Sequence, residues 1–393
     1  MQPRGTSADF ALLFAAFAAA LGFGTLIPLV PVYLAASGAD VAWHSGALPA
    51  VFLAAASVSA PFWGHLSDRV ARRFVVMAGS GGAALAVIPF LLGHGLAKLY
   101  VFQVLAGLSY GAVAPSALAL LYEMGDSDRR ARRVAWFGAA TIGGFLTGPA
   151  LGGWLAALAE GAAGLPVHRV VLGALGAQSV TAAVAAVFVH LTAATSVRPA
   201  GSFDQPLATR ETRTAMAALL AATLASFMIG SFEIATALHL RGPLALGSRD
   251  VAALFITCSA AMGITQLVFL SRISSAVSRV PLALALVAGS GALLAAMPLA
   301  DSYFATLSLA SLIGASLGLA VGLLGLQIAT AAGARRGFAL GLQNTAFNAG
   351  QAVGSMLGGI LFASLGEVAL ALLGVGVVLL SLALHGAGRL GRL

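Results

Sequence analysis

The sequence predicts an all-α membrane protein in which twelve transmembrane helices form two pseudo-symmetric six-helix bundles. Three observations predict this class: twelve long apolar stretches, a bias of cationic residues toward alternate connections, and small-residue motifs that recur between the two halves. Of 393 residues, 60% are hydrophobic and 9% are charged, too few polar groups to cover a soluble protein. We therefore expect most of the exterior to face lipid.

Each predicted span is an apolar stretch of about 20 residues or more, the length that crosses a bilayer. The first begins near Phe10 and continues to about Leu34, so we interpret it as a span rather than a removable signal peptide. In chain order the predicted spans are 9–35, 44–64, 74–95, 98–122, 133–158, 168–191, 214–240, 250–270, 280–299, 303–328, 337–364 and 367–387.

The cationic residues predict the orientation of these spans. With the amino terminus in the cytoplasm, 17 of the 21 Lys and Arg residues fall on inner segments, and only Lys98, Arg169, Arg241 and Arg249 fall outside. This asymmetry follows the positive-inside rule and places both termini in the cytoplasm. The net charge of +8 is spread over these loops, beside anionic headgroups, so it indicates the lipid bilayer and no nucleic acid as partner.

Residues 192–213 form the longest polar interruption and predict a cytoplasmic linker between an N-terminal bundle (1–191) and a C-terminal bundle (214–393). Two motifs repeat across this division at offsets of 206 and 207 residues. Gly144, Gly148, Gly152 and Gly153 recur as Gly350, Gly354, Gly358 and Gly359, and the segment 107–111 recurs as 314–318. Two duplicated halves that meet around a midplane cavity are typical of transporters that alternate access to either side.

Catalysis is not expected in this chain. Short loops leave no room for a soluble catalytic domain, and the pattern Gly107-x-Ser109-x-Gly111 lies inside a span, without the strand that a nucleophile elbow needs. Cys258 is the only cysteine, and no cluster has metal-ligand spacing, so we expect no metal and no cofactor.

The connection between spans two and three runs Gly64-His65-Leu66-Ser67-Asp68-Arg69-Val70-Ala71-Arg72-Arg73. It resembles the signature loop of the major facilitator superfamily, with Ala71 where the family usually has glycine. The resemblance covers the whole chain and implies a cytoplasmic gate, with Gly64 allowing a close helix approach; the alternative is a solvated cationic loop. The predicted gate residues are Gly64, Asp68, Arg69, Arg72, Arg73 and, as a partner for the loop arginines, Glu123.

Span five carries Gly144-Phe145-Leu146-Thr147-Gly148-Pro149-Ala150-Leu151-Gly152-Gly153, which resembles the Gly-Pro element of the family's antiporter branch. Span one, with prolines after Gly22-Phe23-Gly24, is similar to the first helix of drug:proton antiporters. Proline removes a backbone hydrogen bond and bends a helix, although both segments are also consistent with ordinary packing. The predicted bending residues are Pro28, Pro31, Gly144, Gly148, Pro149 and Gly152.

Glu233 is the one acidic residue deep within a predicted span. A charge there costs roughly 2.5–3.5 kcal/mol on insertion scales, so such a group usually faces a wet interior or takes up a proton. Its setting, Ser231-Phe232-Glu233 followed downstream by Gly263-Ile264-Thr265-Gln266 in span eight, is similar to that in small multidrug exporters of the superfamily, which implies proton coupling or binding of a substrate cation. The alternative is a carboxyl bonded structurally to a neighbouring helix.

Span eleven presents four neutral amides, most of them on one helical face. Amides supply donors and acceptors without the cost of burying a charge, so this face is predicted to line a substrate cavity, unless the amides form interhelical hydrogen bonds. These residues are Gln343, Asn344, Asn348 and Gln351, with weaker candidates at Gln103, Tyr110, Gln178, Gln266 and Gln327.

The predicted function is export of a small amphipathic or cationic drug-like molecule by proton antiport, by a monomer in a bacterial cytoplasmic (inner) membrane. The family's fourth helix often carries arginine where this chain has Gln103. This departure weakens the assignment of proton coupling. The amide-rich face of span eleven suggests the alternative, a metabolite, sugar or siderophore carrier of the same fold that need not be coupled to protons.

Overall fold

We describe a computed structural model covering residues 4–93, 95–123, 127–160, 165–192, 209–269, 279–331 and 336–389. The first half of the described chain contains α1 (Arg4–Ser37), α2 (Val41–Arg69), α3 (Arg72–Leu85), α4 (Ile88–Leu91), α5 (Leu96–Glu123), α6 (Ser127–Glu160) and α7 (Val167–Thr192). The second half contains α8 (Thr209–Arg241), α9 (Ser248–Phe269), α10 (Arg279–Ala296), the 3₁₀ helix η2 (Met297–Leu299), α11 (Tyr303–Ala331), α12 (Arg336–Leu365) and α13 (Val368–Arg389).

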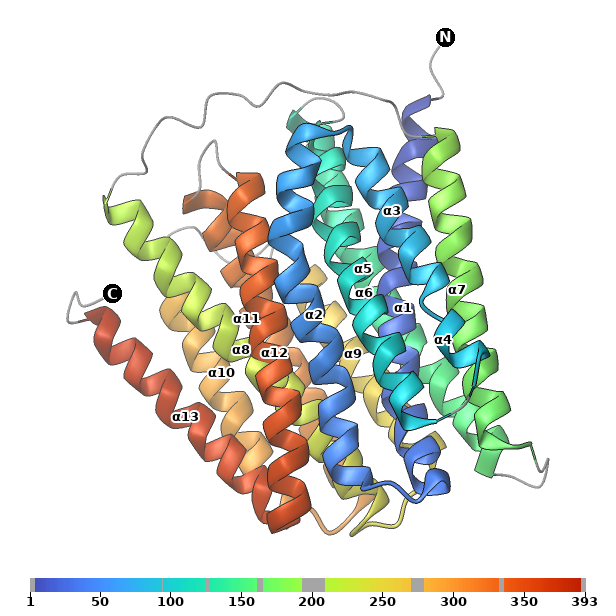
Figure 1. Cartoon of the computed structure of the whole chain (residues 1–393). Coiled ribbons are helices and arrows are strands. Elements are labelled where there is room, and N and C mark those ends of the chain that lie inside the picture. Colours follow the sequence, from blue (N-terminus) through green and yellow to red (C-terminus); the bar gives the residue numbers. More distant parts are fainter. Residues whose placement is uncertain are drawn as a thin grey trace. The chain divides into compact units, whose positions relative to one another are not determined.

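Twelve spans in the described residues are long and apolar enough to cross a membrane, which confirms the predicted number (Figure 1). Two of them contain a break. The third is divided into α3 and α4 just before Pro89, and the ninth tightens into η2 at Pro298. Proline cannot donate the backbone hydrogen bond that a continuous helix needs, which accounts for both breaks.

The helix α2 also extends beyond its predicted end at residue 64 and continues to Arg69. Only Val70 and Ala71 then separate it from α3. Ala71 has φ −60° and ψ 124°, an extended backbone that any residue can adopt. The alanine at the family's glycine position is therefore compatible with this turn.

The chain forms two compact units, which are described separately. The first comprises Met1–Ala39 and Val51–Phe203, and the second comprises Asp40–Ala50 and Asp204–Leu393. The first turns of α2 thus belong to the second unit, where Gly46 packs against Gly359 of α12: a Cβ on Gly46 would lie 2.8 Å from the Gly359 Cα. The domain boundaries at 191 and 213 stay predictions, since residues 193–208 lie outside the described part.

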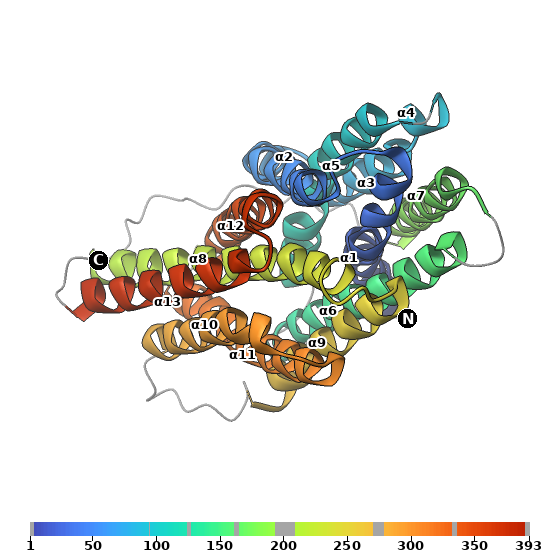
Figure 2. The same ribbon diagram turned by 90° about the horizontal axis from the view of Figure 1, so that it is seen from below.

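In the first unit, α6 packs closely along α1 (Figure 2). Gly144, Gly148 and Gly152 face α1, and a Cβ on each would overlap the carbonyl oxygen of Phe17, Leu21 or Thr25, respectively. Spacings of four place these residues on one face of each helix. Small residues in such a row let two backbones approach closely in lipid.

The second unit repeats this packing at an offset of 206 residues on both helices. Gly350 and Gly354 of α12 meet the carbonyl groups of Thr223 and Phe227 on α8, and Gly358 lies beside Ser231. In Figure 2, α12 lies along one side of α8, with α10 and α11 on the other. We refer to this α8–α12 contact, formed by Gly350, Gly354 and Gly358, as the C-terminal seam, and to its α1–α6 equivalent as the N-terminal seam.

A second pair of contacts repeats in the same way. Gly107 of α5 meets the Phe52 carbonyl on α2, as Gly314 of α11 meets that of Cys258 on α9. Together with the two seams, this shows that the halves share their internal packing as well as their motifs.

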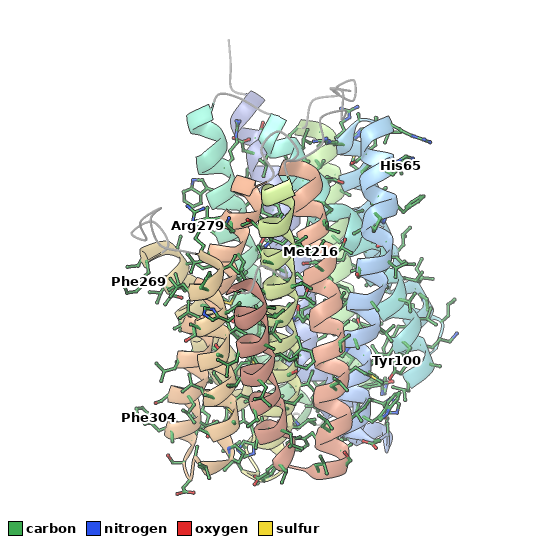
Figure 3. The ribbon with its side chains drawn as sticks, turned by 90° about the vertical axis from the view of Figure 1, so that its left-hand side faces the viewer. His65, Tyr100, Met216, Phe269, Arg279 and Phe304 are labelled. Atoms are coloured by element: carbon green, nitrogen blue, oxygen red, sulfur yellow. The ribbon has the colours of Figure 1, made fainter. Side chains whose placement is uncertain are left out.

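Apolar side chains also cover the outside of the helices, as expected for a surface in contact with lipid. Phe269 and Phe304 are 49% and 76% exposed and project outward from α9 and α11 (Figure 3). Exposed apolar residues recur along most spans. In a soluble protein, patches of this kind would promote association.

Candidate functional site: an acid–amide pair in α8 and α12

Glu233 of α8 and Gln351 of α12 lie side by side within their spans. The Gln351 Nε2 donates a hydrogen bond of 3.0 Å to the Glu233 Oε2, and Gln351 is only 4% exposed. The carboxyl therefore points toward another helix rather than into hydrocarbon. A buried carboxylate needs such a donor, because burying an unpaired charge costs several kcal/mol.

The C-terminal seam positions the pair. Gly230 lies one turn before Glu233, and a Cβ there would meet Ser355 and the backbone of Gln351, so its lack of a side chain allows the two helices to approach. The Ser231 hydroxyl donates to the Gly354 carbonyl at 3.3 Å. The buried hydroxyl of Ser355 has no hydrogen-bond partner among the described residues.

Two further predicted amides continue along α12. The Asn348 Nδ2 donates to the Asn344 Oδ1 at 3.2 Å, within the same helix. Gln343 lies beside Gly325 of α11, and a Cβ on that glycine would be 3.6 Å from its Nε2. With Gln351, these residues form a polar stripe on α12 that leads from Glu233 toward the beginning of the helix.

The weaker cavity candidates do not gather at one place in the described contacts. Gln103 is 3% exposed, and its Oε1 has no partner among the described residues, whereas Gln178 packs against Gly22 of α1. Gln266 and Gln327 are half-buried on α9 and α11. Their roles as cavity residues stay predictions.

Tyr110 belongs to an aromatic cluster in the first unit that the sequence interpretation missed. Phe52 is at the centre of the chain of contacts, with ring centroids 5.2 Å from Phe23 and 5.4 Å from Tyr110. Phe145 of α6 joins through Phe23, at 6.1 Å in an edge-on arrangement. The cluster unites α1, α2, α5 and α6.

The repeat shows how differently the two halves use the same positions. Residues at offsets of 206 or 207 from the four aromatics are Ile229, Cys258, Leu317 and Gln351. The first half therefore places rings where the second half places smaller side chains and the amide partner of Glu233. The two halves thus share a scaffold but differ in sequence, with an aromatic cluster in the first and a polar pair in the second.

The predicted cytoplasmic gate is described only in part. The side chains of Asp68 and Glu123 lie outside the described residues. Arg69 is exposed, and the Arg73 guanidinium lies 4.7 Å from the Phe74 ring centroid. Among the described residues, a Cβ on Gly64 would meet no atom within 4 Å. The close helix approach expected at Gly64 stays a prediction.

The predicted bending prolines contribute to the N-terminal seam. A Cβ on Gly24 would lie 3.0 Å from the Cδ of Pro149, and one on Gly152 would lie 2.9 Å from the Cγ of Pro28. Each proline thus packs against a glycine of the opposite helix. Both α1, which also contains Pro31, and α6 continue through their prolines, and bending at these residues stays a prediction.

Among the described residues, no group of three or more His, Cys, Asp or Glu could hold a metal ion. A polytopic membrane protein with two repeated halves and a polar pair inside one of them has the architecture of a transporter. The comparisons with known proteins agree with this class.

The family model described as the Major Facilitator Superfamily matches residues 12–332. The chain belongs to this superfamily, and it is a transporter rather than an enzyme. The quinolone resistance protein NorA of Staphylococcus aureus is 24% identical over 359 residues, which cover 90% of this chain and 89% of that protein. The class D tetracycline resistance protein of Salmonella ordonez is 36% identical over 141 residues, or 34% of each chain.

Two solved structures show the same fold. The bacterial homologue of the human lysosomal transporter Spinster, in an inward-facing and occupied conformation, has a TM-score of 0.78 at 14% identity, with 99% of this chain and 98% of that chain covered. The human organic anion transporter MFSD10 (TETRAN) has a TM-score of 0.73 at 18% identity, with 98% and 100% covered.

Proposed function

We propose that this chain exports an amphipathic or cationic drug-like molecule in exchange for protons, as a monomer in a bacterial cytoplasmic membrane with both termini inside. The observation that carries the proposal is the Glu233–Gln351 hydrogen bond, because it combines an ionisable group within a span with a neutral partner that can follow its change of charge. A carboxyl in this setting can take up and release a proton without leaving the protein interior.

Two further observations support a drug-like substrate. The aromatic cluster around Phe52 is the proposed contact for a flat apolar molecule, because aromatic rings stack on such molecules and their faces attract cations. Two relatives are named as quinolone and tetracycline resistance proteins, and resistance to these drugs in proteins of related sequence supports a drug-like substrate here. In this proposal Arg69, Arg72 and Arg73 act at the cytoplasmic gate, and alternation of access occurs by the bending of α1 and α6.

The proposal is tested by uptake into everted membrane vesicles with and without an imposed pH gradient. We expect Glu233→Gln to abolish gradient-driven accumulation, while the exposed Asp301→Asn, which changes an acid outside the helices, leaves it at the wild-type rate. Amounts of each variant in the membrane are compared by immunoblot. Full accumulation by the Glu233 variant would show that the proton role is wrong.

The polar stripe of α12 favours a second candidate, a carrier for a hydroxylated metabolite such as a sugar or siderophore. Asn344, Asn348 and Gln343 present amides that could bind hydroxyl groups. A thermal-shift screen of purified protein against lipophilic cations, sugars and chelators separates the two candidates, since a ligand that binds the folded state raises its melting temperature.

A further inference from the structure

Gln351 is in direct hydrogen-bond contact with Glu233, so any change in the charge of the carboxyl acts on its amide. Its side chain is almost fully buried, and its Nε2 lies 3.0 Å from the Glu233 Oε2 across the C-terminal seam. The seam on either side is formed by backbone packed against backbone, at Gly350 and Gly354. The position of Gln351 relative to Glu233 is therefore fixed by the helices themselves.

The amide suits both charge states of the carboxyl. An ionised carboxylate only accepts hydrogen bonds, so it pairs with the Gln351 Nε2, whereas a protonated carboxyl has an O–H that the Gln351 Oε1 can accept. Exchanging the two ends of the amide requires only rotation about its last side-chain torsion, which has two broad minima. A leucine or a serine at this place could not offer both partners over the same distance.

The equivalent seam in the first half lacks this chemistry. Subtracting 206 from Glu233 and Gln351 gives Ile27 and Phe145, and Ser355 corresponds to Pro149. The two seams share their glycines but differ in polarity. Only the C-terminal seam, among the described helices, pairs an acid with an amide at these positions.

Few other titratable groups in the described residues lie where they could interact electrostatically with the Glu233 carboxyl. Cys258 of α9 lies close enough to interact with it electrostatically. The other described titratable groups on helices packed against α8 lie at or near helix ends: Arg249, Asp250, Arg279, Tyr303 and His385. Glu367, in the turn between α12 and α13, pairs with His239.

We propose that Gln351 is a positioning residue that sets the pH range of transport, by stabilising the ionised form of Glu233 through its Nε2. The inference rests on the proposed proton-coupled function of Glu233. The amide bonds both charge states, but its hydrogen bond to the ionised carboxylate is the stronger of the two, because the acceptor is charged. Without the amide, the carboxyl therefore gives up its proton less readily, and release requires a higher pH. A hydrogen bond to a charged group is strong enough to move the midpoint by about one pH unit.

The test is gradient-driven uptake in everted vesicles, measured as a function of pH for the wild type, Gln351→Leu and Gln351→Asn. We expect the midpoint of both variants to move about one pH unit upward. Asparagine keeps an amide group, but its side chain is one methylene too short to reach the Glu233 carboxyl. The Gln351→Asn variant therefore replaces Gln351→Leu in the test if leucine prevents folding. Ser364→Ala is the control, because that hydroxyl, within the described part of the chain, donates to carbonyls of its own helix alone.

The outcomes separate the two proposals. If Glu233→Gln abolishes gradient-driven uptake but the Gln351 variants keep the wild-type midpoint, the role of Gln351 is overturned while the proton role of Glu233 stands. If Glu233→Gln retains full uptake, the proposed function fails first. A purely structural role of Gln351 would lower the amount of folded protein without moving the midpoint, and that result would also overturn the inference.

Discussion

Asp9 of α1 and Arg133 of α6 form an ion pair, with 2.8 Å between the Asp9 Oδ2 and the Arg133 Nε. Their side chains are 23% and 14% exposed, so water screens the pair only in part. The pair lies at one end of the N-terminal seam. Residues at an offset of 206, Ala215 and Ala339, cannot form an equivalent pair in the second half.

Removing one member of this pair should destabilise the first unit. Asp9→Asn leaves the Arg133 guanidinium half-buried without its carboxylate, and we expect a loss of about 1–3 kcal/mol in the free energy of unfolding. The double variant Asp9→Asn/Arg133→Gln should lose less than the sum of the two single variants, because the charge left behind is removed as well. Thermal unfolding in detergent measures all three, and additive losses would show that the pair contributes no coupling.

Gly152 should tolerate no side chain. A Cβ there would overlap the Thr25 carbonyl and lie 2.9 Å from the Cγ of Pro28, so Gly152→Ala must push α1 and α6 apart, and we expect a loss of about 1–3 kcal/mol. Gly138, on the same helix, has open space where a Cβ would be. Gly138→Ala should therefore be neutral or stabilising by up to about 1 kcal/mol. Equal effects of the two substitutions on the melting temperature would contradict the close packing.

Much of the fold follows from the sequence, because a span is a local property. About 20 apolar residues identify a helix that crosses the bilayer, and the repeat of Gly144 and Gly148 as Gly350 and Gly354 predicts equivalent packing in the two halves. Apolarity did not predict the breaks at Pro89 and Pro298, since an apolar run continues through them. It also missed the end of α2, where most of the helical residues from His65 to Arg69 are polar.

The site was harder to predict, because its partners lie far apart in the chain. The cost of burying a charge singled out Glu233, but the amide chemistry of Gln351 suits a cavity wall as well as an interhelical bond. Only the packing of α8 on α12 shows that Gln351 forms the interhelical hydrogen bond to Glu233. The sequence did not predict the aromatic cluster, because nothing distinguishes Phe23 and Phe52 from the other phenylalanines among the 21 of this apolar chain.

His239 should matter for its packing more than for its charge. It is 2% exposed, and its Nδ1 lies 3.1 Å from the Oε1 of Glu367, whose side chain is 42% exposed. We expect His239→Ala to cost about 2–4 kcal/mol by leaving a cavity beside α8. Glu367→Gln should cost about 1 kcal/mol or less, because solvent screens an exposed partner. Unfolding curves in detergent test the comparison, and a Glu367→Gln loss as large as that of His239→Ala would assign the stability to the ion pair.

Phe52 should govern affinity for aromatic substrates. Leucine at this position keeps most of the buried volume but removes the ring contacts to Phe23 and Tyr110, at 5.2 and 5.4 Å. Because one aromatic contact contributes about 0.5–1.5 kcal/mol, we expect Phe52→Leu to raise the KM for an aromatic cation such as ethidium about three- to tenfold. The maximal rate should change little.

A non-aromatic cation, tetrapropylammonium, distinguishes ring recognition from a general defect. Its KM should rise less than that of ethidium in Phe52→Leu, because it has no flat face to lay against a ring. Phe62→Leu provides the matched control: Phe62 is 63% exposed and pairs with Trp63 at 5.3 Å, away from the cluster. Equal rises for both cations would mean that Phe52 supports the fold of α2 and α5 rather than the substrate, and the aromatic cluster would then cease to support a drug-like substrate.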